Sequence, residues 1–286
     1  MNTIKLKSML LQYFNEDIGD GDLSSETIFS TSDQGSFIFY AKESGIFCGR
    51  QIIEIGFPLL DDHLHVRVLK EDGQWISEGE QLAMIEGPIR SLLAGERVIL
   101  NLIQRMSGIA TSAYEAVQLV KGTNANICDT RKTMPGLRML DKYAVRTGGA
   151  YNHRSGLYDA IMLKDNHIAF AGSITKAVTS ARAKIGHTVK IEVEIETKDQ
   201  LIEAVEAGAD IIMFDNRTPD EIRSWLPFIP DHMATEASGG ITLENLRSYA
   251  ESGVQWISLG TLTHSVKAFD ISALVQLKGV IASGTH

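Results

Sequence analysis

The sequence of 286 residues is short of several features that define whole classes of protein. It has only two cysteines, Cys48 and Cys128, and they lie far apart in the chain. In a reducing compartment such cysteines are more often buried small hydrophobes than a disulfide, and we expect this here. The eight histidines show no HxxxH or similar ligand spacing. The sequence therefore indicates neither a disulfide scaffold nor a zinc site.

Long apolar runs and an excess of positive charge are also missing. No window approaches the length of a membrane span, and the first residues carry lysines without the apolar core or cleavage site of a signal peptide. We therefore expect a cytoplasmic protein. The formal net charge of -9 argues against nonspecific binding to nucleic acid. No GxGxxG motif follows the first strand of the second half, so a dinucleotide site is not expected.

The first 110 residues have the pattern of a small α+β domain. Residues 1–14 are spaced like a short amphipathic helix, and the acidic, glycine-containing stretch 16–29 is predicted to be a loop. Strands are expected at three short apolar runs, 37–41, 64–69 and 82–85, with a helix at 49–57 between the first two. Pro88 then begins a helical pattern that carries Arg97 and Arg105 and is expected to break at the small residues 107–111.

From about residue 111 apolar strands alternate with amphipathic helices. Ser173, Thr197, Thr218 and Thr242 stand where helix N-caps are expected. Repeated βα units predict a parallel sheet, and their compact spacing favours a closed barrel of about six or seven strands over an open sheet. The expected strands are 125–128, 160–163, 189–195, 211–214, 233–237 and 256–259.

Polar or ionisable groups, or glycines, follow these strands, at the end of a βα barrel where functional groups lie. Five cations there run against the acidic background, and they predict either a bound anion or a network of salt bridges with Asp129, Asp141, Asp159 and Asp165. The cations are Arg131, Lys132, His153, Arg154 and Lys164.

Two further patterns at the strand ends suggest phosphate chemistry. The strand at 191–196 alternates isoleucine and valine with Glu192, Glu194 and Glu196, so three carboxylates are expected to face inward. Glu194 and Asp215 could hold Mg²⁺ directly or through water. The loops 238–240 and 260–261 are predicted to form a phosphate cup, in which a helix that begins near Thr242 adds positive potential.

Residues 129–168, DTRKTMPGLRMLDKYAVRTGGAYNHRSGLYDAIMLKDNHI, resemble the signature region of the quinolinate phosphoribosyltransferase family. The resemblance extends over nearly the whole chain, through EDIGDGDLSSETI, LNLIQRMSGIAT, IEVEIE, MFDN, EASGGI and ISLGTLTHS. The chain departs from the family pattern at Ala150, where a third glycine is frequent, and at Ser155, where methionine is common.

This resemblance implies an enzyme of NAD biosynthesis that converts quinolinate and 5-phosphoribosyl-1-pyrophosphate, with Mg²⁺, into nicotinate mononucleotide, pyrophosphate and CO₂. It implies an α/β sandwich domain at 1–110, an irregular barrel of about seven strands at 111–270, and a segment 271–286 that packs back on the first domain. It also implies a homodimer or hexamer in which one subunit covers the barrel mouth of another.

The family's site residues map onto matching positions of this sequence. The resemblance implies quinolinate contacts at Arg131, His153 and Arg154, and an arginine from the neighbouring subunit at Arg105. It places Lys132 and Lys164 beside the substrate and pyrophosphate, and Glu194 and Asp215 near the ribose hydroxyls and magnesium. The remaining implied substrate contacts are Thr130, Ser238, Gly239, Gly240, Leu259, Gly260 and Thr261.

Three alternatives stay open at this point. The first is a paralogue of the same family that is associated with molybdenum transport. The second is a phosphate-binding aldolase or isomerase, which would use Lys164 as a Schiff-base lysine. The third is a non-catalytic protein that binds a phosphometabolite, which would keep the phosphate cup without needing Glu194, Asp215 and the arginines together.

Overall fold

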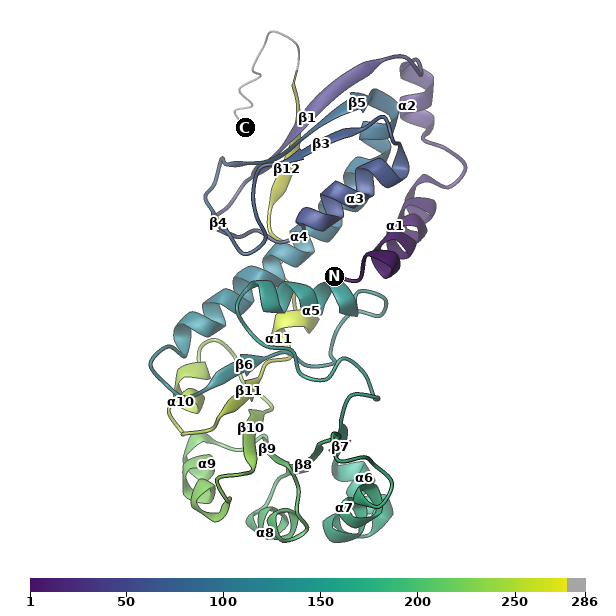
Figure 1. Ribbon diagram of the computed structural model, residues 1–286. Helices are drawn as coiled ribbons and strands as arrows, with labels where there is room; N and C mark the ends of the chain where they lie inside the picture. The colour runs from purple at the N-terminus through teal and green to yellow at the C-terminus, as the bar shows by residue number, and fades with distance from the viewer. Residues whose placement is uncertain (277–286) are drawn as a thin grey trace. The chain divides into compact units, whose positions relative to one another are not determined.

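The computed structural model describes residues 1–276, which divide into two compact units (Figure 1). The first comprises Met1–Thr111, Met139–Gly148 and the described part of Val266–His286, and the second comprises Ser112–Arg138 and Gly149–Ser265. The domain boundaries expected near residues 110 and 270 stay a prediction, and the units differ from them at α5 (Arg138–Thr147), most of which belongs to the first unit.

The first unit contains an antiparallel sheet of four strands in the order β12-β1-β5-β3. The strands are β1 (Gln34–Ala41), β3 (His65–Val68), β5 (Gln81–Pro88) and β12 (Ile271–Val275), and the pair β2 (Gly45–Ile46) and β4 (Trp75–Ile76) stands apart. Within the segment expected to pack back on this domain, 271–275 therefore pairs with β1, while 277–286 lies outside the described residues.

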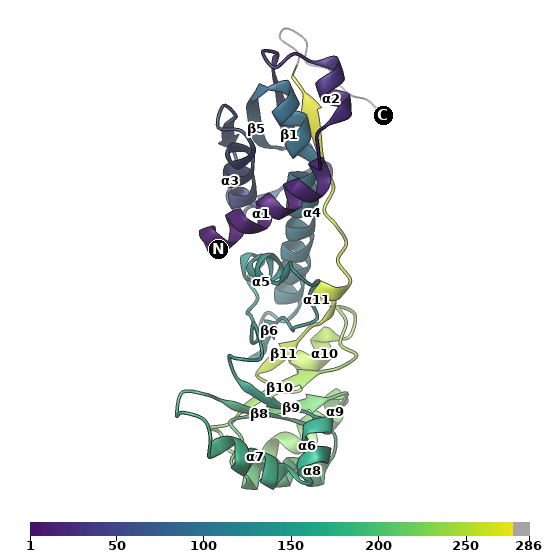
Figure 2. The same cartoon turned by 90° about the vertical axis from the view of Figure 1, so that its right-hand side faces the viewer.

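Aromatic side chains form the core between this sheet and α3 (Arg50–Leu60). Phe37 and Phe39 alternate onto one face of β1, and their rings lie 5.8 and 6.1 Å from the ring of Phe57 on α3. The helix α1 (Thr3–Ile18) then packs against α3 with a buried stripe that includes Leu6 and Leu10 (Figure 2). All five side chains are almost fully buried, so burial of apolar surface holds this unit together.

The stretch 16–29, predicted to be a loop, instead contains the end of α1 and the short helix α2 (Leu23–Ile28). The prediction of a loop was wrong for these residues because Asp22 caps a helix. Its side chain accepts the backbone N–H groups of Ser24 and Ser25, each at 3.1 Å.

The predicted break at residues 107–111 was also wrong, since α4 (Ile89–Leu119) passes through it without interruption. The small residues serve close packing instead. A Cβ atom at Gly108 would clash with the carbonyl oxygen of Lys267, and Ser107 Oγ accepts the backbone N–H of Cys48 at 3.0 Å. Small side chains within a helix can therefore mark close contact with another segment as readily as a helix end.

The second unit is built on a parallel sheet in the order β6-β11-β10-β9-β8-β7, with a further parallel bridge from Cys128 to Tyr151 beside β6. The predicted alternation of strands and helices is confirmed. The strands are β6 (Asn126–Cys128), β7 (Ile161–Leu163), β8 (Ile191–Ile195), β9 (Ile211–Asp215), β10 (Ala234–Ser238) and β11 (Trp256–Ser258).

Helices cover the outer side of this sheet (Figure 1). Ser173, Thr197 and Thr218 cap α7, α8 and α9 as predicted, each by accepting a backbone N–H group. Thr242 does not cap a helix, because residues 243–245 form a turn and Asn245 precedes the five-residue α10. The helices are α6 (Asp165–Ala171), α7 (Ile174–Arg182), α8 (Lys198–Glu206), α9 (Pro219–Trp225), α10 (Leu246–Ala250) and α11 (Thr261–His264).

Cys48 and Cys128 are both buried thiols outside any disulfide, as predicted. Among residues 1–276, no helix combines the length and the apolar character that crossing a membrane requires. The expected cytoplasmic location stays a prediction.

Candidate active site

A cavity of about 610 Å³ opens at the carboxyl ends of the parallel strands in the second unit. All but two of the predicted site residues line it, so the residues that follow the strands surround one cavity. These residues are Thr130, Arg131, Lys132, His153, Arg154, Lys164, Glu194, Asp215, Ser238, Gly239, Gly240, Gly260 and Thr261.

The two predicted residues outside the cavity lining are Leu259 and Arg105. Leu259 is fully buried, and its backbone N–H donates to the carbonyl of Cys128. Arg105 belongs to the first unit, where its Nε and Nη2 atoms both lie 2.8 Å from the carboxylate of Asp141. This two-point ion pair occupies the planar edge with which an arginine would also bind a substrate carboxylate.

Several residues that line the cavity were not predicted as contacts. Glu236 stands in the middle of β10 and His264 ends α11, so neither immediately follows a strand. The period-two pattern of β10 could have indicated Glu236, since it shares a face with Ser238. The other additional lining residues are Asp129, Met162, Met213, Asn216, Ile241, Thr242 and Ser258.

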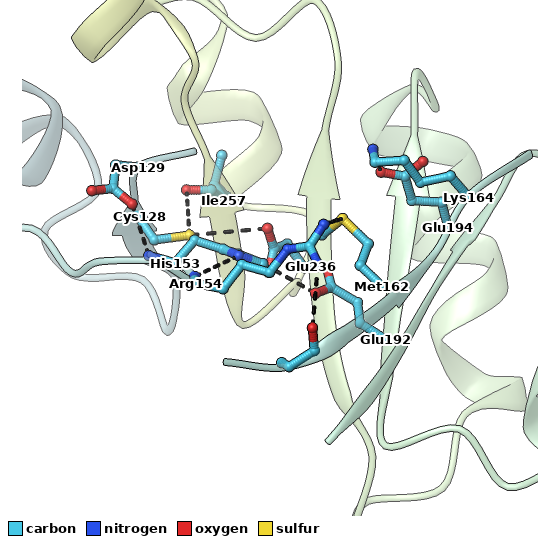
Figure 3. A network of polar contacts seen from close by, with 11 residues as sticks. Cys128, Asp129, His153, Arg154, Met162, Lys164, Glu192, Glu194, Glu236 and Ile257 are labelled. Atoms are coloured by element: carbon cyan, nitrogen blue, oxygen red, sulfur yellow. Dashed lines mark hydrogen bonds and ion pairs between the residues drawn. The ribbon is translucent and has the colours of Figure 1, made fainter. Parts of the chain in front are cut away.

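The imidazole of His153 contacts two buried carboxylates (Figure 3). Its Nε2 atom lies 3.1 Å from Glu192 and 3.5 Å from Glu236, which are 1% and 4% exposed. The three ligand-type atoms are close enough to hold a metal ion. The 3.1 Å between Nε2 and Glu192 is, however, the length of a hydrogen bond, so the imidazole of His153 itself already binds the carboxylate.

The second ring nitrogen of His153 is engaged as well, because its Nδ1 accepts the backbone N–H of Arg154 at 2.8 Å. Burial disfavours a charged ring, but hydrogen bonds and charge from Glu192 and Glu236 outweigh burial and raise the pKa of His153 to about 10. The Nδ1 contact opposes this shift, since it requires an unprotonated Nδ1. Both nitrogens thus bind within the chain, which suits His153 to hold Arg154 in place.

Asp129 fixes the segment that carries these cations. It is fully buried at the end of β6, and it accepts the backbone N–H of His153 at 2.8 Å and the side-chain amide of Asn152 at 2.7 Å. Through these two bonds Asp129 holds the backbone at His153 in place. The bridge between Cys128 and Tyr151 brings the two segments together at this point.

Arg131 and Arg154 bring like charge into the same cavity. Burial is the largest cause that lowers the pKa of Arg154, and the nearby charge of Arg131 lowers it further. Arg154 donates to the carbonyl of Ala160 at 3.2 Å and lies 3.4 Å from the sulfur of Met162. Among the described residues, Nε of Arg131 is buried without a hydrogen-bond partner. Two guanidinium groups held together in this way favour binding of a ligand with more than one negative charge.

The acidic side of the cavity is formed by Glu194 on β8 and Asp215 at the end of β9. Glu194 forms an ion pair with Lys164 (Figure 3). The predicted inward row of three glutamates is correct for Glu192 and Glu194 but wrong for Glu196, which lies beyond the strand and is exposed. The strand ends one residue too early to turn that third carboxylate inward.

Carboxylate oxygens from neighbouring strands suit Mg²⁺, which binds few protein ligands and keeps water or phosphate oxygens in its shell. Glu194 and Asp215 are not among the groups of three or more ligand residues found within residues 1–276. They therefore fit a magnesium ion that arrives with a substrate phosphate better than one held in a protein cage.

Two glycine-containing turns complete the cavity. Gly239 and Gly240 both have positive φ, at 89° and 63°, and Gly239 packs directly on Asn216. Gly260 lies close to Lys132, so a side chain there would press on that lysine. The predicted contribution of a helix N-terminus at 238–242 was wrong, because the next helix begins only at Leu246. A phosphate here would be met by backbone N–H groups of turns.

The fold and the cavity together define an α/β protein that binds polyanionic ligands at the carboxyl ends of a parallel sheet. A family model described as the C-terminal domain of quinolinate phosphoribosyl transferase matches residues 109–274, and the model of its N-terminal domain matches residues 22–107. The chain belongs to the quinolinate phosphoribosyltransferase family.

Individual relatives agree with the family models over almost the full length. The chain is 56% identical to a probable carboxylating nicotinate-nucleotide pyrophosphorylase of Bacillus subtilis, over 97% of this chain and 96% of that protein. It is 36% identical to the carboxylating nicotinate-nucleotide pyrophosphorylase of Rattus norvegicus, over 91% and 88%. The crystal structure of NadC from Streptococcus pyogenes is 37% identical and covers 96% of this chain and 98% of its own, with a TM-score of 0.92.

Proposed function

We infer that the chain is an enzyme that transfers the phosphoribosyl group of 5-phosphoribosyl-1-pyrophosphate to quinolinate with loss of CO₂, in NAD biosynthesis. The products are nicotinate mononucleotide, pyrophosphate and CO₂. The observation that carries this conclusion is the pairing of two arginines with an acidic pair in one cavity, in a chain that is 56% identical to a probable carboxylating pyrophosphorylase.

We assign the two carboxylates of quinolinate to Arg131 and Arg154. Each guanidinium can bind one carboxylate through two hydrogen bonds. The buried Nε of Arg131, which has no partner in the part of the chain that the structure describes, supports this assignment. His153 would act through Arg154, whose backbone N–H it accepts. Binding of a dianion would also remove the repulsion between the two arginines.

The phosphoribosyl donor would occupy the opposite part of the cavity. Its 5-phosphate suits the turns at 238–240 and 260–261, where glycine allows a close approach of the backbone. Lys132 and Lys164 would neutralise the pyrophosphate as it leaves, and Glu194 and Asp215 would accept hydrogen bonds from the ribose hydroxyls. Mg²⁺ held by this acidic pair, directly or through water, would supply positive charge to the pyrophosphate.

The reaction then needs positioning more than covalent catalysis. The pyridine nitrogen of quinolinate forms a bond to the anomeric carbon while the bond from that carbon to the pyrophosphate oxygen breaks. In the resulting pyridinium, the bond to the adjacent carboxylate breaks, its electrons remain on the ring carbon, and a proton replaces the CO₂. Arg131 and Arg154 would orient the ring so that its nitrogen faces the ribose.

The test is a turnover assay with quinolinate, 5-phosphoribosyl-1-pyrophosphate and Mg²⁺, with nicotinate in a parallel reaction. We expect nicotinate mononucleotide and CO₂ from quinolinate alone, because only a dianion matches both arginines. An absence of product from both acids would contradict the assignment and favour the transport-associated paralogue or a non-catalytic binding protein. Omission of Mg²⁺ should abolish turnover if the metal contributes as proposed.

We also propose that the chain forms a homodimer or a hexamer. Three large apolar side chains of the second unit, Leu157, Tyr158 and Phe170, are 76%, 83% and 94% exposed, and a second copy would cover such groups. Arg105, the residue implied to cross to a neighbour, would first have to leave Asp141, whereas Arg97 on the same helix is exposed. Light scattering on the purified protein tests this proposal, and the mass of a monomer would refute it.

A further inference from the structure

Arg138 links two segments of the cavity wall without lining the cavity itself. It is half-buried at the start of α5, and its Nε donates to the hydroxyl of Thr133 at 3.0 Å. One terminal nitrogen donates to the carbonyl of Ser155 at 3.1 Å, and the other to the carbonyl of Arg131 at 3.4 Å. Three donors of one guanidinium therefore reach two loops.

These two loops carry the two arginines that we propose bind the carboxylates of quinolinate. The first holds Arg131 and ends at the Thr133 contact, and the second holds Arg154 immediately before Ser155. Since Arg131 and Arg154 repel each other, the loops tend to separate unless something holds them together. Asp129 fixes the second loop at the residues before Arg154. The contact from Arg138 to Ser155 fixes the side after it.

We propose that Arg138 is a positioning residue that sets the spacing between the two arginines that bind the carboxylates of quinolinate. A guanidinium suits this task because its planar fork reaches three acceptors at fixed angles, which a lysine cannot do. Its own charge is directed into loop oxygens and not into the cavity. The inference rests on the proposed function, since it concerns the spacing of the carboxylate contacts in that reaction.

The test compares steady-state kinetics of the wild type and Arg138→Ala for each substrate separately. We expect the KM for quinolinate to rise by about tenfold or more, with a smaller change in the KM for 5-phosphoribosyl-1-pyrophosphate. Guanidinium ion at millimolar, non-denaturing concentration should partly restore the KM for quinolinate by filling the space of the missing side chain. Calorimetric titration of quinolinate should show the same loss of affinity without turnover.

Arg247→Ala is the matched control. Arg247 also joins two segments of the second unit through backbone carbonyls, those of Leu119 and Lys121 at 3.2 and 2.8 Å, but none of these residues lines the cavity. We expect both KM values of this variant to stay within about twofold of wild type and guanidinium to have no effect on it.

The outcomes separate the inference from the proposed function. A wild type without turnover refutes the function, whereas an active wild type with an unchanged quinolinate KM in Arg138→Ala refutes the role of Arg138. An equal rise in both KM values without guanidinium rescue also overturns it, because that pattern indicates general loss of structure. If Arg138→Ala does not fold, Arg138→Lys and Thr133→Val decide the question by the same criterion.

Discussion

The two units treat their buried polar groups in opposite ways. In the first unit the fully buried Asp141 binds Arg105 at two points, and the half-buried Asp72 accepts two backbone N–H groups and the hydroxyl of Tyr143. In the second unit three buried side-chain atoms have no hydrogen-bond partner within residues 1–276. They belong to Arg131, Glu192 and Ser258.

This difference separates groups that stabilise the fold from groups that are held ready for a ligand. Leaving a buried polar atom unpaired costs about 1–3 kcal/mol, so the second unit tolerates a cost that the first avoids. Arg131 and Ser258 line the cavity, and Glu192 lies directly beneath His153. Substitutions in the first unit should therefore reduce stability, whereas those around the cavity should reduce activity.

The largest expected effect is the loss of activity in Arg154→Ala. Removal of one partner of a charged pair in a binding site weakens the interaction enough to lower kcat/KM for quinolinate roughly 100-fold or more. The temperature of unfolding should remain close to that of the wild type, because the repulsion from Arg131 disappears with the side chain. Arg223→Ala, which removes only an exposed ion pair with Asp220, is the control and should retain full activity. Equal rates in the two variants would refute the site.

Arg105→Ala should show the opposite behaviour. It leaves Asp141 fully buried without its ion-pair partner, which should lower the free energy of unfolding by about 3 kcal/mol. Denaturant titration measures this change, and kcat/KM of the folded fraction should stay within a few-fold of wild type. A large loss of turnover at unchanged stability would contradict this comparison, and it would support the cross-subunit role that the family resemblance implies for Arg105.

A pair of serines makes the comparison sharper. Ser107 in the first unit accepts the backbone N–H of Cys48 and donates to its carbonyl, so Ser107→Ala should cost about 1–2 kcal/mol of stability. Ser258 in the second unit is also buried, but its hydroxyl has no hydrogen-bond partner within the described residues, so Ser258→Ala should leave stability unchanged or slightly raised. Thermal unfolding of both variants tests this, and equal destabilisation would remove the distinction between the units.

The sequence predicted the second unit better than the first because its signals are local. The N-caps at Thr197 and Thr218, and the polar residues that follow each strand, depend on neighbours a few residues away. Parallel strands then bring their carboxyl ends to one edge, so the position of Lys164 or Asp215 in the cavity follows from the strand assignment alone.

The features that were missed depend on contacts between distant segments. The helix α4 continues through Gly108 because that residue packs against Lys267, far away in the chain. Likewise, the pairing of Glu236 with His153 is seen only when β10 brings the two side chains together. Arg105 was assigned to the site by resemblance, and its partner Asp141 lies on a helix within the signature region. Periodicity in a sequence carries no information about such pairs.

The smallest expected effect concerns acid stability, where Asp61 of the first unit and Glu192 of the second should differ in sign. The Ser91 hydroxyl and the N–H of His63 bind Asp61 in the first unit and lower its pKa, while burial raises the pKa of Glu192 in the second. A pKa that is lowered in the folded state adds stability at pH values above the unfolded pKa of about 4, and this contribution is lost as the pH falls through the folded pKa.

Ser91→Ala should therefore cost less than about 1 kcal/mol at pH 7 and nothing at strongly acidic pH. The free energy of unfolding, measured from pH 2 to 7, should fall less steeply toward acidic pH in the variant than in the wild type. An equal dependence on pH would mean that the bond from Ser91 does not stabilise the charged carboxylate.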